Sequence, residues 1–379
     1  MRRAALLAGW LLVTLTGCAA APGPNGAALV AQDRLEPIVK QTWTTRDFRL
    51  ESGTVLPELT LVYERYGRLA ADGRNAILVT HGFTSSQHAA GKYSPADEAA
   101  GWWDGLIGPG KAIDTNRYFV VASNMLGSSY GSTAPASVDP RTGRRYGPDF
   151  PAITLRDIVA AQKAMLDALG VKHLVAVAGP SFGGYQAFQW AVTYPDAMRG
   201  IVAVVTAPKG GGGQAAVESL RARLATDSGW NGGWHYDKGG GVETMTAIRV
   251  ETLQRYGTNE VLARTIADPA ARDAELRRQA AAWARDFDPN SLVTLRQASV
   301  RFDAERDFDT IKARVLYVIS RTDKLFPPSI APAVMDKLAK AGVQASYFEI
   351  DTELGHVASG PEWAKWGPRL QRFLEDLDR

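Results

Sequence analysis

The residues Gly179-Pro180-Ser181-Phe182-Gly183 form a G-x-S-x-G motif, which in enzymes can expose a serine hydroxyl for nucleophilic attack. An apolar stretch, LVAVAG, leads into the motif, and a helix is predicted from the serine to about Tyr194. A serine on such a strand-to-helix turn stands above the edge of a sheet, and the glycines give neighbouring backbone room. The pattern predicts Ser181 as a nucleophile. The competing interpretation, a helix N-cap serine, would not require both glycines.

The residues Gly127-Ser128-Ser129-Tyr130-Gly131 match the same pattern, and they too follow a predicted strand. The segment after them, STAPASVDPRTG, contains two prolines and predicts a turn-rich loop without a helix. Ser129 therefore lacks the helix that a nucleophile turn requires, and Ser181 is the prediction.

A serine hydroxyl becomes a good nucleophile when a base removes its proton, and histidine often serves as that base. Two histidines follow Ser181 in the chain. His235 precedes any acid of the core, whereas His356 follows the last predicted strand, where a loop can carry it over the nucleophile. We therefore predict His356 as the base. The other histidines are His81, His88 and His173.

An aspartate that orients the histidine should follow the strand VLYVIS, and Asp323 does so in Ser-Arg-Thr-Asp. Asp351 ends the neighbouring strand, five residues before His356, and is the alternative. Either residue could instead be an ordinary turn aspartate at a strand end.

The oxyanion that forms when serine attacks a carbonyl group needs backbone N–H donors. One should be the amide of Phe182, directly after the nucleophile. The other should come from the loop after AILVTHG, where Phe83 is the candidate. Loss of one such donor costs about 100- to 1000-fold in rate.

These residues need a scaffold, and the chain alternates short apolar stretches with helical ones from about residue 43 onward. Such alternation predicts an α/β fold with a mostly parallel sheet covered on both faces. Thr154 and Asp157 predict the capped start of a helix over 155–169, which Gly170 ends. The predicted strands are LTLVYERY (59–66), AILVTHG (76–82), YFVVASN (118–124), LVAVAG (174–179), IVAVVTA (201–207), VLYVIS (315–320) and ASYFEI (345–350).

The alternation stops between residues 208 and 300, where helical stretches such as ARDAELRRQAAAWARDF replace the strands. We interpret residues 208–300 as a helical lid inserted into a core of residues 43–207 and 301–379. The glycine runs at 210–213 and 239–241 are not followed by the Lys-Ser/Thr of a nucleotide-binding loop. They are therefore interpreted as flexible connections of the lid.

The first 18 residues have the order of a signal peptide. Arg2 and Arg3 precede an apolar run at 4–14 that is too short to span a bilayer as a stable helix. Leu15-Thr16-Gly17-Cys18 then resembles a bacterial lipobox, so we expect lipidation of Cys18, the single cysteine of the chain. The alternative is an ordinary signal peptide that happens to contain a cysteine.

Lipidation would attach the protein to a membrane of the cell envelope, facing the periplasm or the exterior. Residues 19–42 are rich in alanine, proline and glycine and would then form a tether. Without Arg2 and Arg3, 41 basic residues face 40 acidic ones, and this near-neutral charge gives no basis for binding nucleic acid. The histidines show no i, i+4 pair, so neither a metal nor a cofactor is expected.

Several stretches are similar to homoserine O-acetyltransferases. They are GWWDGLIGPGKAIDTNRYFVVASN, YGPDFPAITLRDIVAAQKAMLDALGV, GPSFGGYQAFQWAVTYPD, WNGG at 230–233 and DKLFPP at 323–328. The resemblance covers residues 45–375 and is densest over 101–195. It implies an α/β-hydrolase fold with a helical lid and acyl transfer from an acyl-CoA through an acyl-Ser181 intermediate.

The resemblance also implies the triad Ser181, Asp323 and His356, and a homodimer, because such enzymes commonly dimerise through the lid. It further implies that Arg249 binds the substrate carboxylate, although the match needs a one-residue gap. The alternative is a solvated arginine on a helix.

The chain departs from the family at Val357, where the family typically has an aspartate that contacts homoserine. Valine cannot accept a hydrogen bond, and an unpaired buried polar group of the substrate would cost about 1–3 kcal/mol. An exported protein would also lack cytoplasmic acetyl-CoA. We therefore expect hydrolysis of a small-molecule ester through acyl-Ser181. The alternatives are O-acyl transfer to homoserine or a related alcohol, and a catalytically inactive lipoprotein that binds a partner.

Overall fold

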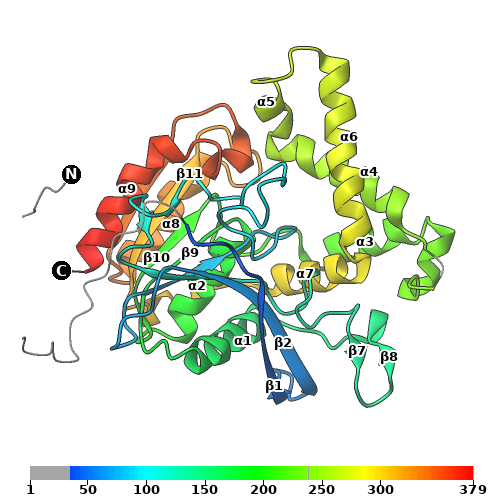
Figure 1. Ribbon diagram of the computed structural model, residues 1–379, viewed down its shortest axis with the longest axis horizontal. Helices are drawn as coiled ribbons and strands as arrows, with labels where there is room; N and C mark the ends of the chain where they lie inside the picture. The colour runs from blue at the N-terminus through cyan, green and yellow to red at the C-terminus, as the bar shows by residue number, and fades with distance from the viewer. Residues whose placement is uncertain (1–34, 238, 379) are drawn as a thin grey trace, which may run out of the picture. The chain divides into compact units, whose positions relative to one another are not determined.

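The structure is a computed structural model that describes residues 35–237 and 239–378. Eight strands form one twisted sheet in the order β1-β2-β6-β3-β9-β10-β11-β12 (Figure 1). The pairs β1–β2 and β2–β6 are antiparallel, and the other pairs are parallel. The strands are β1 (Gln41–Arg49), β2 (Val55–Tyr66), β3 (Ala76–Thr80), β6 (Phe119–Ser123), β9 (Leu174–Pro180), β10 (Met198–Val204), β11 (Arg314–Ser320) and β12 (Ala345–Ile350).

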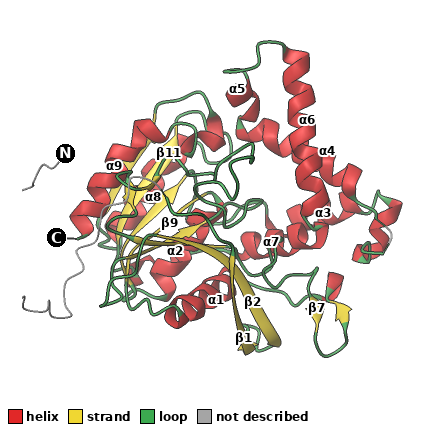
Figure 2. Cartoon of the chain, in the orientation of Figure 1, coloured by secondary structure: helices red, strands yellow, loops and turns green. Residues whose placement is uncertain are grey.

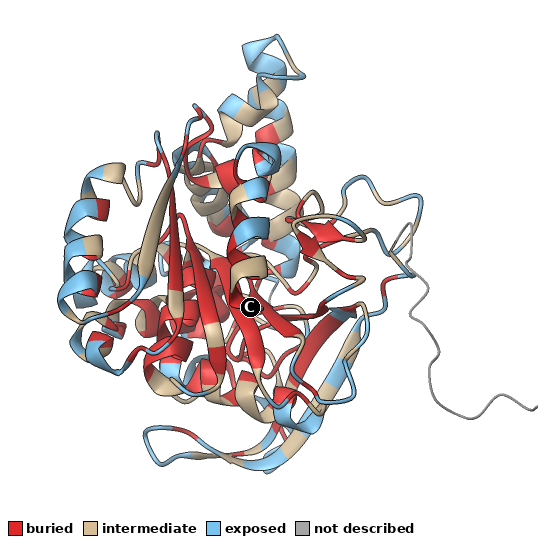
Figure 3. Cartoon of the chain, turned by 90° about the vertical axis from the view of Figure 1, so that its left-hand side faces the viewer, coloured by how far each residue is buried: buried red, intermediate tan, exposed pale blue. Residues whose placement is uncertain are grey.

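Helices cover both faces of this sheet (Figure 2), as the alternating pattern predicted. Alternate residues of one strand pack into different clusters: Leu78 of β3 joins one, whereas Ile77 and Val79 join the other. Such alternation is the geometry of a strand buried on both sides, and the central strands are buried along their length (Figure 3). The helices beside the sheet are α1 (Leu155–Ala168), α2 (Phe182–Thr193), α8 (Ala331–Lys340) and α9 (Trp363–Leu377).

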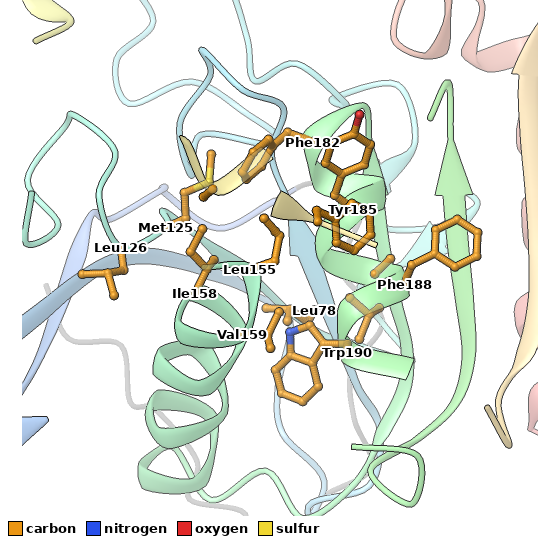
Figure 4. Packing of buried hydrophobic residues seen from close by; sticks show 14 of the residues in the cluster. Leu78, Met125, Leu126, Leu155, Ile158, Val159, Phe182, Tyr185, Phe188 and Trp190 are labelled. Carbon is orange, nitrogen blue, oxygen red and sulfur yellow. The ribbon is translucent and has the colours of Figure 1, made fainter. Parts of the chain in front are cut away.

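Helices α1 and α2 pack against each other, and α2 also packs against β3; Leu78 of β3 shares one hydrophobic cluster with Val159 and Trp190 (Figure 4). The predicted capping box is confirmed: Asp157 N–H donates to Thr154 Oγ1 at 3.3 Å, and Thr154 N–H donates to the Asp157 carboxylate at 2.8 Å. The start of α1 is therefore set by local sequence, and α1 in turn supports the helix that follows Ser181.

Strand β1 was not predicted, because its residues alternate between half-buried and exposed and include few aliphatic side chains. It lies at the sheet edge and pairs with β2 only. The tether predicted over 19–42 therefore extends too far, since residues 41–42 already belong to β1. The rest of that prediction up to residue 34, together with the signal peptide and Cys18, lies outside the described residues.

The segment between β10 and β11 contains the helices predicted there, and we keep the name lid for residues 208–300. Helix α4 packs against α6, and α3 packs against α7. A β-bridge between Lys209 and Asp303 joins the two ends of the insertion. The lid helices are α3 (Gly213–Leu224), α4 (Val242–Tyr256), α5 (Thr258–Leu262), α6 (Pro269–Asp286) and α7 (Pro289–Arg301), with a 3-10 helix at Ser228–Gly233.

Short elements occupy the connecting loops. The pairs are β4 (Ile107–Gly108) with β5 (Ile113–Asp114) and β7 (Val138–Asp139) with β8 (Arg144–Arg145), and the 3-10 helices are Gly147–Asp149, Glu305–Thr310, Pro328–Ile330 and Gly355–Ser359. No helix within residues 35–237 and 239–378 is long and apolar enough to cross a membrane.

Candidate active site

Ser181 forms the turn between β9 and α2, with φ 56° and ψ −120°, a backbone conformation that is rare for residues other than glycine. Its N–H donates to the Val204 carbonyl at 2.8 Å. Its own carbonyl accepts from Thr206 Oγ1 at 2.7 Å and from the Gly184 N–H at 2.9 Å. The Ser181 side chain caps no helix N–H, so the N-cap interpretation is wrong and the hydroxyl is available for chemistry.

Strand β10 was predicted over 201–207 but covers Met198–Val204. Val205 leaves the strand at φ 44°, an unusual conformation for a β-branched residue. This turn presents Thr206 to the Ser181 carbonyl, so the strand ends early at the place where the nucleophile turn needs a hydrogen-bond donor.

The glycines on either side of Ser181 allow β3 to lie against the turn. A Cβ at Gly179 would be 2.2 Å from Thr80 Oγ1, and one at Gly183 would be 2.2 Å from the Thr80 carbonyl oxygen. In the structure, Thr80 Oγ1 donates to the Gly183 carbonyl at 2.9 Å. The two glycines of the motif are thus required by the close approach of two backbone segments.

His356 and Asp323 come together at the carboxyl end of the sheet. His356 lies in the 3-10 helix Gly355–Ser359, and its Nδ1 is 2.8 Å from Asp323 Oδ2. The other oxygen, Asp323 Oδ1, accepts from the N–H groups of Leu325 and Phe326 at 2.8 and 3.1 Å. A carboxylate held in this way places the imidazole proton on Nδ1, which leaves the Nε2 lone pair able to accept a proton.

The alternative acid, Asp351, does not reach this histidine. Its side chain is 85% exposed and pairs with Arg321 at 2.9 Å. Asp323 and His356 are both buried, so their interaction is shielded from water.

Ser181 and His356 meet at one cavity of about 430 Å³. Ser181 lines it directly, and the imidazole packs against two of its walls, with ring centroids 4.7 Å from Tyr256 and 5.7 Å from Phe326. Within the described residues, no hydrogen bond joins the Ser181 hydroxyl to the imidazole. Such contacts often tighten only when substrate binds.

The two predicted oxyanion donors flank the nucleophile. A Cβ at Gly82 would lie 3.8 Å from Ser181 Cβ, so the loop after β3 passes directly beside the serine. The rings of Phe83 and Phe182 are 5.6 Å apart and close one side of the cavity. The loop that carries Phe83 and the start of α2, which carries Phe182, thus both border the cavity at Ser181, where an oxyanion would form.

His81 lies directly before this loop and was not assigned a role from the sequence. It is fully buried, and its Nε2 is 2.9 Å from Asn124 Oδ1. Burial lowers the pKa of His81 to about 4, so the ring is neutral at physiological pH. We therefore assign His81 a structural role, in which it holds the loop that carries Phe83.

The remaining sequence candidates have structural partners. Ser129 Oγ accepts from the Asp288 N–H at 2.9 Å and thereby connects a core loop to the start of α7. His235 Nε2 lies 3.4 Å from the Asp288 carboxylate, within the lid. His88 Nδ1 lies 3.2 Å from the buried Glu64. None of these groups lines the Ser181 cavity.

Arg249 lies on α4, and its side chain reaches the loop after β3. Its Nη1 donates to Thr84 Oγ1 at 2.6 Å, and the guanidinium lies 4.9 Å from the ring centre of Trp283. Burial lowers the pKa of Arg249, and its Nε has no hydrogen-bond partner. Among the described residues, no carboxylate pairs with it. The alternative of a solvated arginine is therefore wrong.

Thr84 and Trp283 are site residues that sequence reasoning missed. Both line the cavity, and Trp283 Nε1 donates to the Thr84 carbonyl at 3.1 Å, which joins α6 to the loop after β3. Thr84 follows Phe83 directly, so its place in the predicted oxyanion loop could have indicated that it lies at the site. Trp283 sits in a charged helical stretch, where nothing distinguishes it from a packing residue.

Comparison with known proteins identifies the fold class of the chain. The family model for the alpha/beta hydrolase fold matches residues 75–359. The chain is therefore an enzyme of the α/β-hydrolase fold, as predicted. The homoserine O-acetyltransferase of Symbiobacterium thermophilum is 39% identical over 357 residues, which cover 87% of this chain and 92% of that protein. The chain belongs to the homoserine O-acetyltransferase family.

Two solved structures agree in fold but differ in the activity that they are named for. Esterase E22 has a TM-score of 0.81 and 30% identity, covering 89% of this chain and 100% of its own. A homoserine O-acetyltransferase from Bacillus anthracis has a TM-score of 0.81 and 28% identity, covering 89% and 98%. One of these two neighbours is thus named for acyl transfer and the other for ester hydrolysis.

Proposed function

We propose that this enzyme transfers an acyl group through acyl-Ser181 to a small alcohol that carries a carboxylate, as homoserine does. The observation that carries the proposal is Arg249, a half-buried and partly desolvated cation beside the cavity without a carboxylate partner among the described residues. A buried unpaired charge is costly, and a substrate carboxylate would compensate it. The names of the curated relatives favour transfer over the hydrolysis that was expected from Val357 and from export.

In the first half-reaction, the Ser181 Oγ attacks the acyl carbonyl carbon while His356 Nε2 takes the hydroxyl proton. Asp323, bonded to Nδ1, stabilises the resulting imidazolium. The N–H groups of Phe83 and Phe182 bind the oxyanion. When the tetrahedral intermediate collapses, the thiol or alcohol leaving group takes the proton from His356, and acyl-Ser181 remains.

In the second half-reaction, the hydroxyl of the acceptor takes the place of the leaving group. Arg249 binds the acceptor carboxylate and orients the hydroxyl toward the ester carbonyl of acyl-Ser181. His356 removes the hydroxyl proton as the new C–O bond forms. It then returns that proton to Ser181 Oγ as the serine ester bond breaks, so the enzyme is restored.

Hydrolysis is the second candidate, and Val357 favours it. This residue follows His356 directly and is half-buried. Its side chain cannot accept a hydrogen bond from the amine or hydroxyl of an alcohol substrate. Water needs no such contact. The named esterase activity of a protein with the same fold is consistent with this candidate.

Transfer and hydrolysis can be distinguished by how the acyl-enzyme divides between homoserine and water. The purified enzyme is given acetyl-CoA with and without homoserine, and free acetate and O-acetylhomoserine are measured by mass spectrometry. Dominance of O-acetylhomoserine supports transfer. Release of acetate at the same rate with and without homoserine would contradict it. Val357→Asp should raise the ratio of O-acetylhomoserine to acetate about 10-fold, because it restores a hydrogen-bond acceptor for the substrate's polar group.

We further propose that Cys18 is lipidated and holds the enzyme at a membrane of the cell envelope. The lipobox-like sequence Leu15-Thr16-Gly17-Cys18 supports this proposal. Fractionation tests it: the full chain should sediment with membranes, and Cys18→Ser should move the protein to the soluble fraction. Equal partitioning of both forms would contradict lipidation.

A further inference from the structure

The lid meets the core at the loop that carries His356. Helix α4 packs against the 3-10 helix Gly355–Ser359, and its last residue, Tyr256, has its ring centre 4.7 Å from that of the imidazole. The next residue, Gly257, has φ 93°, and a Cβ there would lie 2.3 Å from the Leu354 carbonyl oxygen. The corner between α4 and α5 therefore lies directly on the backbone that precedes the catalytic histidine.

Arg264, in the turn after α5, makes a second contact with this part of the core. Its Nη2 donates to Oε1 of Glu362, the residue directly before α9. The Glu362 side chain is only 6% exposed, whereas half of the Arg264 side chain is exposed. Burial acts to raise the pKa of Glu362, but bonds to Arg264, Lys365 and Thr352 lower that pKa overall. Glu362 is thus a buried carboxylate that is ionised at neutral pH.

The oxygen of Glu362 that binds Arg264 also connects it to the histidine loop. Thr352 Oγ1 donates to Glu362 Oε1 at 3.1 Å, and the same hydroxyl accepts from the Leu354 N–H at 3.1 Å. A continuous path of hydrogen bonds thus runs from an arginine of the lid, through a buried carboxylate, to the backbone two residues before His356.

The acid of the triad is joined to the same path. Thr322, directly before Asp323, donates through Oγ1 to the Thr352 carbonyl at 3.0 Å. That hydroxyl also accepts from the Gly355 N–H at 3.0 Å. Two threonines therefore hold the histidine loop from the core side, while the lid arginine holds it through the carboxylate.

A second arginine of the lid also bonds the core, but at an exposed place. Arg278 pairs with Glu275 in its own helix and with Glu98 of the core. The side chains of Arg278 and Glu98 are 56% and 82% exposed, and such pairs contribute little. Loss of one partner from a buried ion pair is much more costly, which sets the bond between Arg264 and Glu362 apart.

We propose that Arg264 and Glu362 form a clasp through which the lid holds His356 in its catalytic position. The proposal rests on the role of His356 in the proposed function and adds two positioning residues. When the lid is closed, the corner between α4 and α5 and the clasp fix the histidine loop at two places. When the lid moves away, both contacts are lost together, so the base is released and catalysis waits until the lid closes again.

The test measures how fast Ser181 is acylated. A burst of free thiol from acetyl-CoA gives the acylation rate, and its amplitude gives the fraction of competent enzyme. Arg264→Met removes the cation from the half-exposed side of the clasp. We expect the acylation rate to fall about 10- to 100-fold, as for a small displacement of a catalytic group, and the amplitude to stay unchanged. An unchanged rate would overturn the proposal, and so would a smaller amplitude at an unchanged rate.

The two half-reactions separate positioning from substrate binding. His356 is the base in both, so acylation and transfer to homoserine should slow by the same factor in Arg264→Met. The KM for homoserine should then change less than about two-fold. A rise in this KM at an unchanged kcat would mean that Arg264 acts on acceptor binding, and the clasp would be wrong.

Labelling of Ser181 by a fluorophosphonate provides a readout that does not depend on the acyl donor. It also needs the base, so it should slow in Arg264→Met by the factor seen in acylation. If labelling slowed but acetyl-CoA acylated neither form of the enzyme, the clasp would stand and the proposed function would fail. Equal labelling rates in the two forms would overturn the clasp.

Three further variants and one control locate the effect. Glu362→Gln should slow acylation as much as Arg264→Met does, and the double variant should slow it no further, because the two residues act as one unit. Arg264→Lys keeps the cation and should retain most of the rate. The control is Glu98→Gln, which breaks the exposed pair with Arg278 and should change the rate less than about two-fold. Additive losses in the double variant, or an equal loss in the control, would overturn the proposal.

Discussion

The nucleophile side of the cavity and the lid side are built in different ways. On the nucleophile side, backbone geometry sets the site: Ser181 is held at φ 56°, and the approach of Thr80 leaves no room for a Cβ at Gly183. On the lid side, long side chains reach the cavity from separate helices, as Arg249 does from α4 and Trp283 from α6. The nucleophile side is suited to one reaction. Substitutions on the lid side can alter which substrate binds without moving the catalytic groups.

The sharpest test of this comparison is removal of the nucleophile. Ser181→Ala should lower acyl transfer about 10⁵-fold or more, because no other group on the nucleophile side can form the ester. Labelling by a fluorophosphonate, followed on gels and by mass spectrometry, should be lost. Ser129→Ala is the matched control, since its hydroxyl bonds the Asp288 N–H outside the cavity. Persistent labelling of Ser181→Ala would contradict the assignment.

Loss of the orienting carboxylate should have the next largest effect. Asp323→Asn keeps the shape of the side chain but can reverse the imidazole tautomer, so we expect kcat to fall about 10⁴-fold. Asp351→Asn should change kcat less than about two-fold, because Asp351 is exposed and pairs with Arg321. Steady-state kinetics on one thioester checks both variants. A larger effect at Asp351 would reverse the assignment of the acid.

The nucleophile side was also the more predictable one. The G-x-S-x-G motif, the strand before it and the capped helix α1 depend on residues close together in sequence, and these predictions hold in the structure. The early end of β10 was missed, because Val205 is an ordinary strand former whose turn is imposed by the contact between Thr206 and Ser181. Strand β1 was missed because an edge strand with one half-buried face needs few aliphatic residues.

The lid side was poorly predictable for a physical reason. Trp283 and Arg296 resemble packing or surface residues of amphipathic helices until tertiary contacts bring them to the cavity. Arg249 was noticed only through the family resemblance. Even then, its burial and its bond to Thr84 required the folded lid. Sequence distance between contact partners, rather than residue type, separates what could be predicted from what could not.

A substitution on the lid side should affect binding more than chemistry. Arg249→Met keeps an unbranched apolar stem but removes the cation, so kcat/KM for homoserine should fall about 10- to 100-fold. The acylation rate with acetyl-CoA, measured as a burst of free thiol, should change little. Thr84→Val removes the acceptor of the Arg249 hydrogen bond and should give a smaller loss of the same kind. Equal losses in acylation and in acceptor binding would contradict the division of the cavity into two sides.

The smallest expected effect is on the free energy of unfolding and its dependence on pH, through His81 on the nucleophile side. Its pKa in the fold is about 4, against about 6.5 when unfolded, so the unfolded state binds the proton more readily between these values. Stability should therefore be highest above pH 6.5 and fall by about 2 kcal/mol between pH 8 and pH 5. Urea unfolding at the two pH values measures this difference. His81→Gln keeps a polar partner for Asn124 but cannot titrate, so it should show a smaller difference even if it is less stable overall. An unchanged difference would mean that the acid sensitivity of the fold comes from groups other than His81.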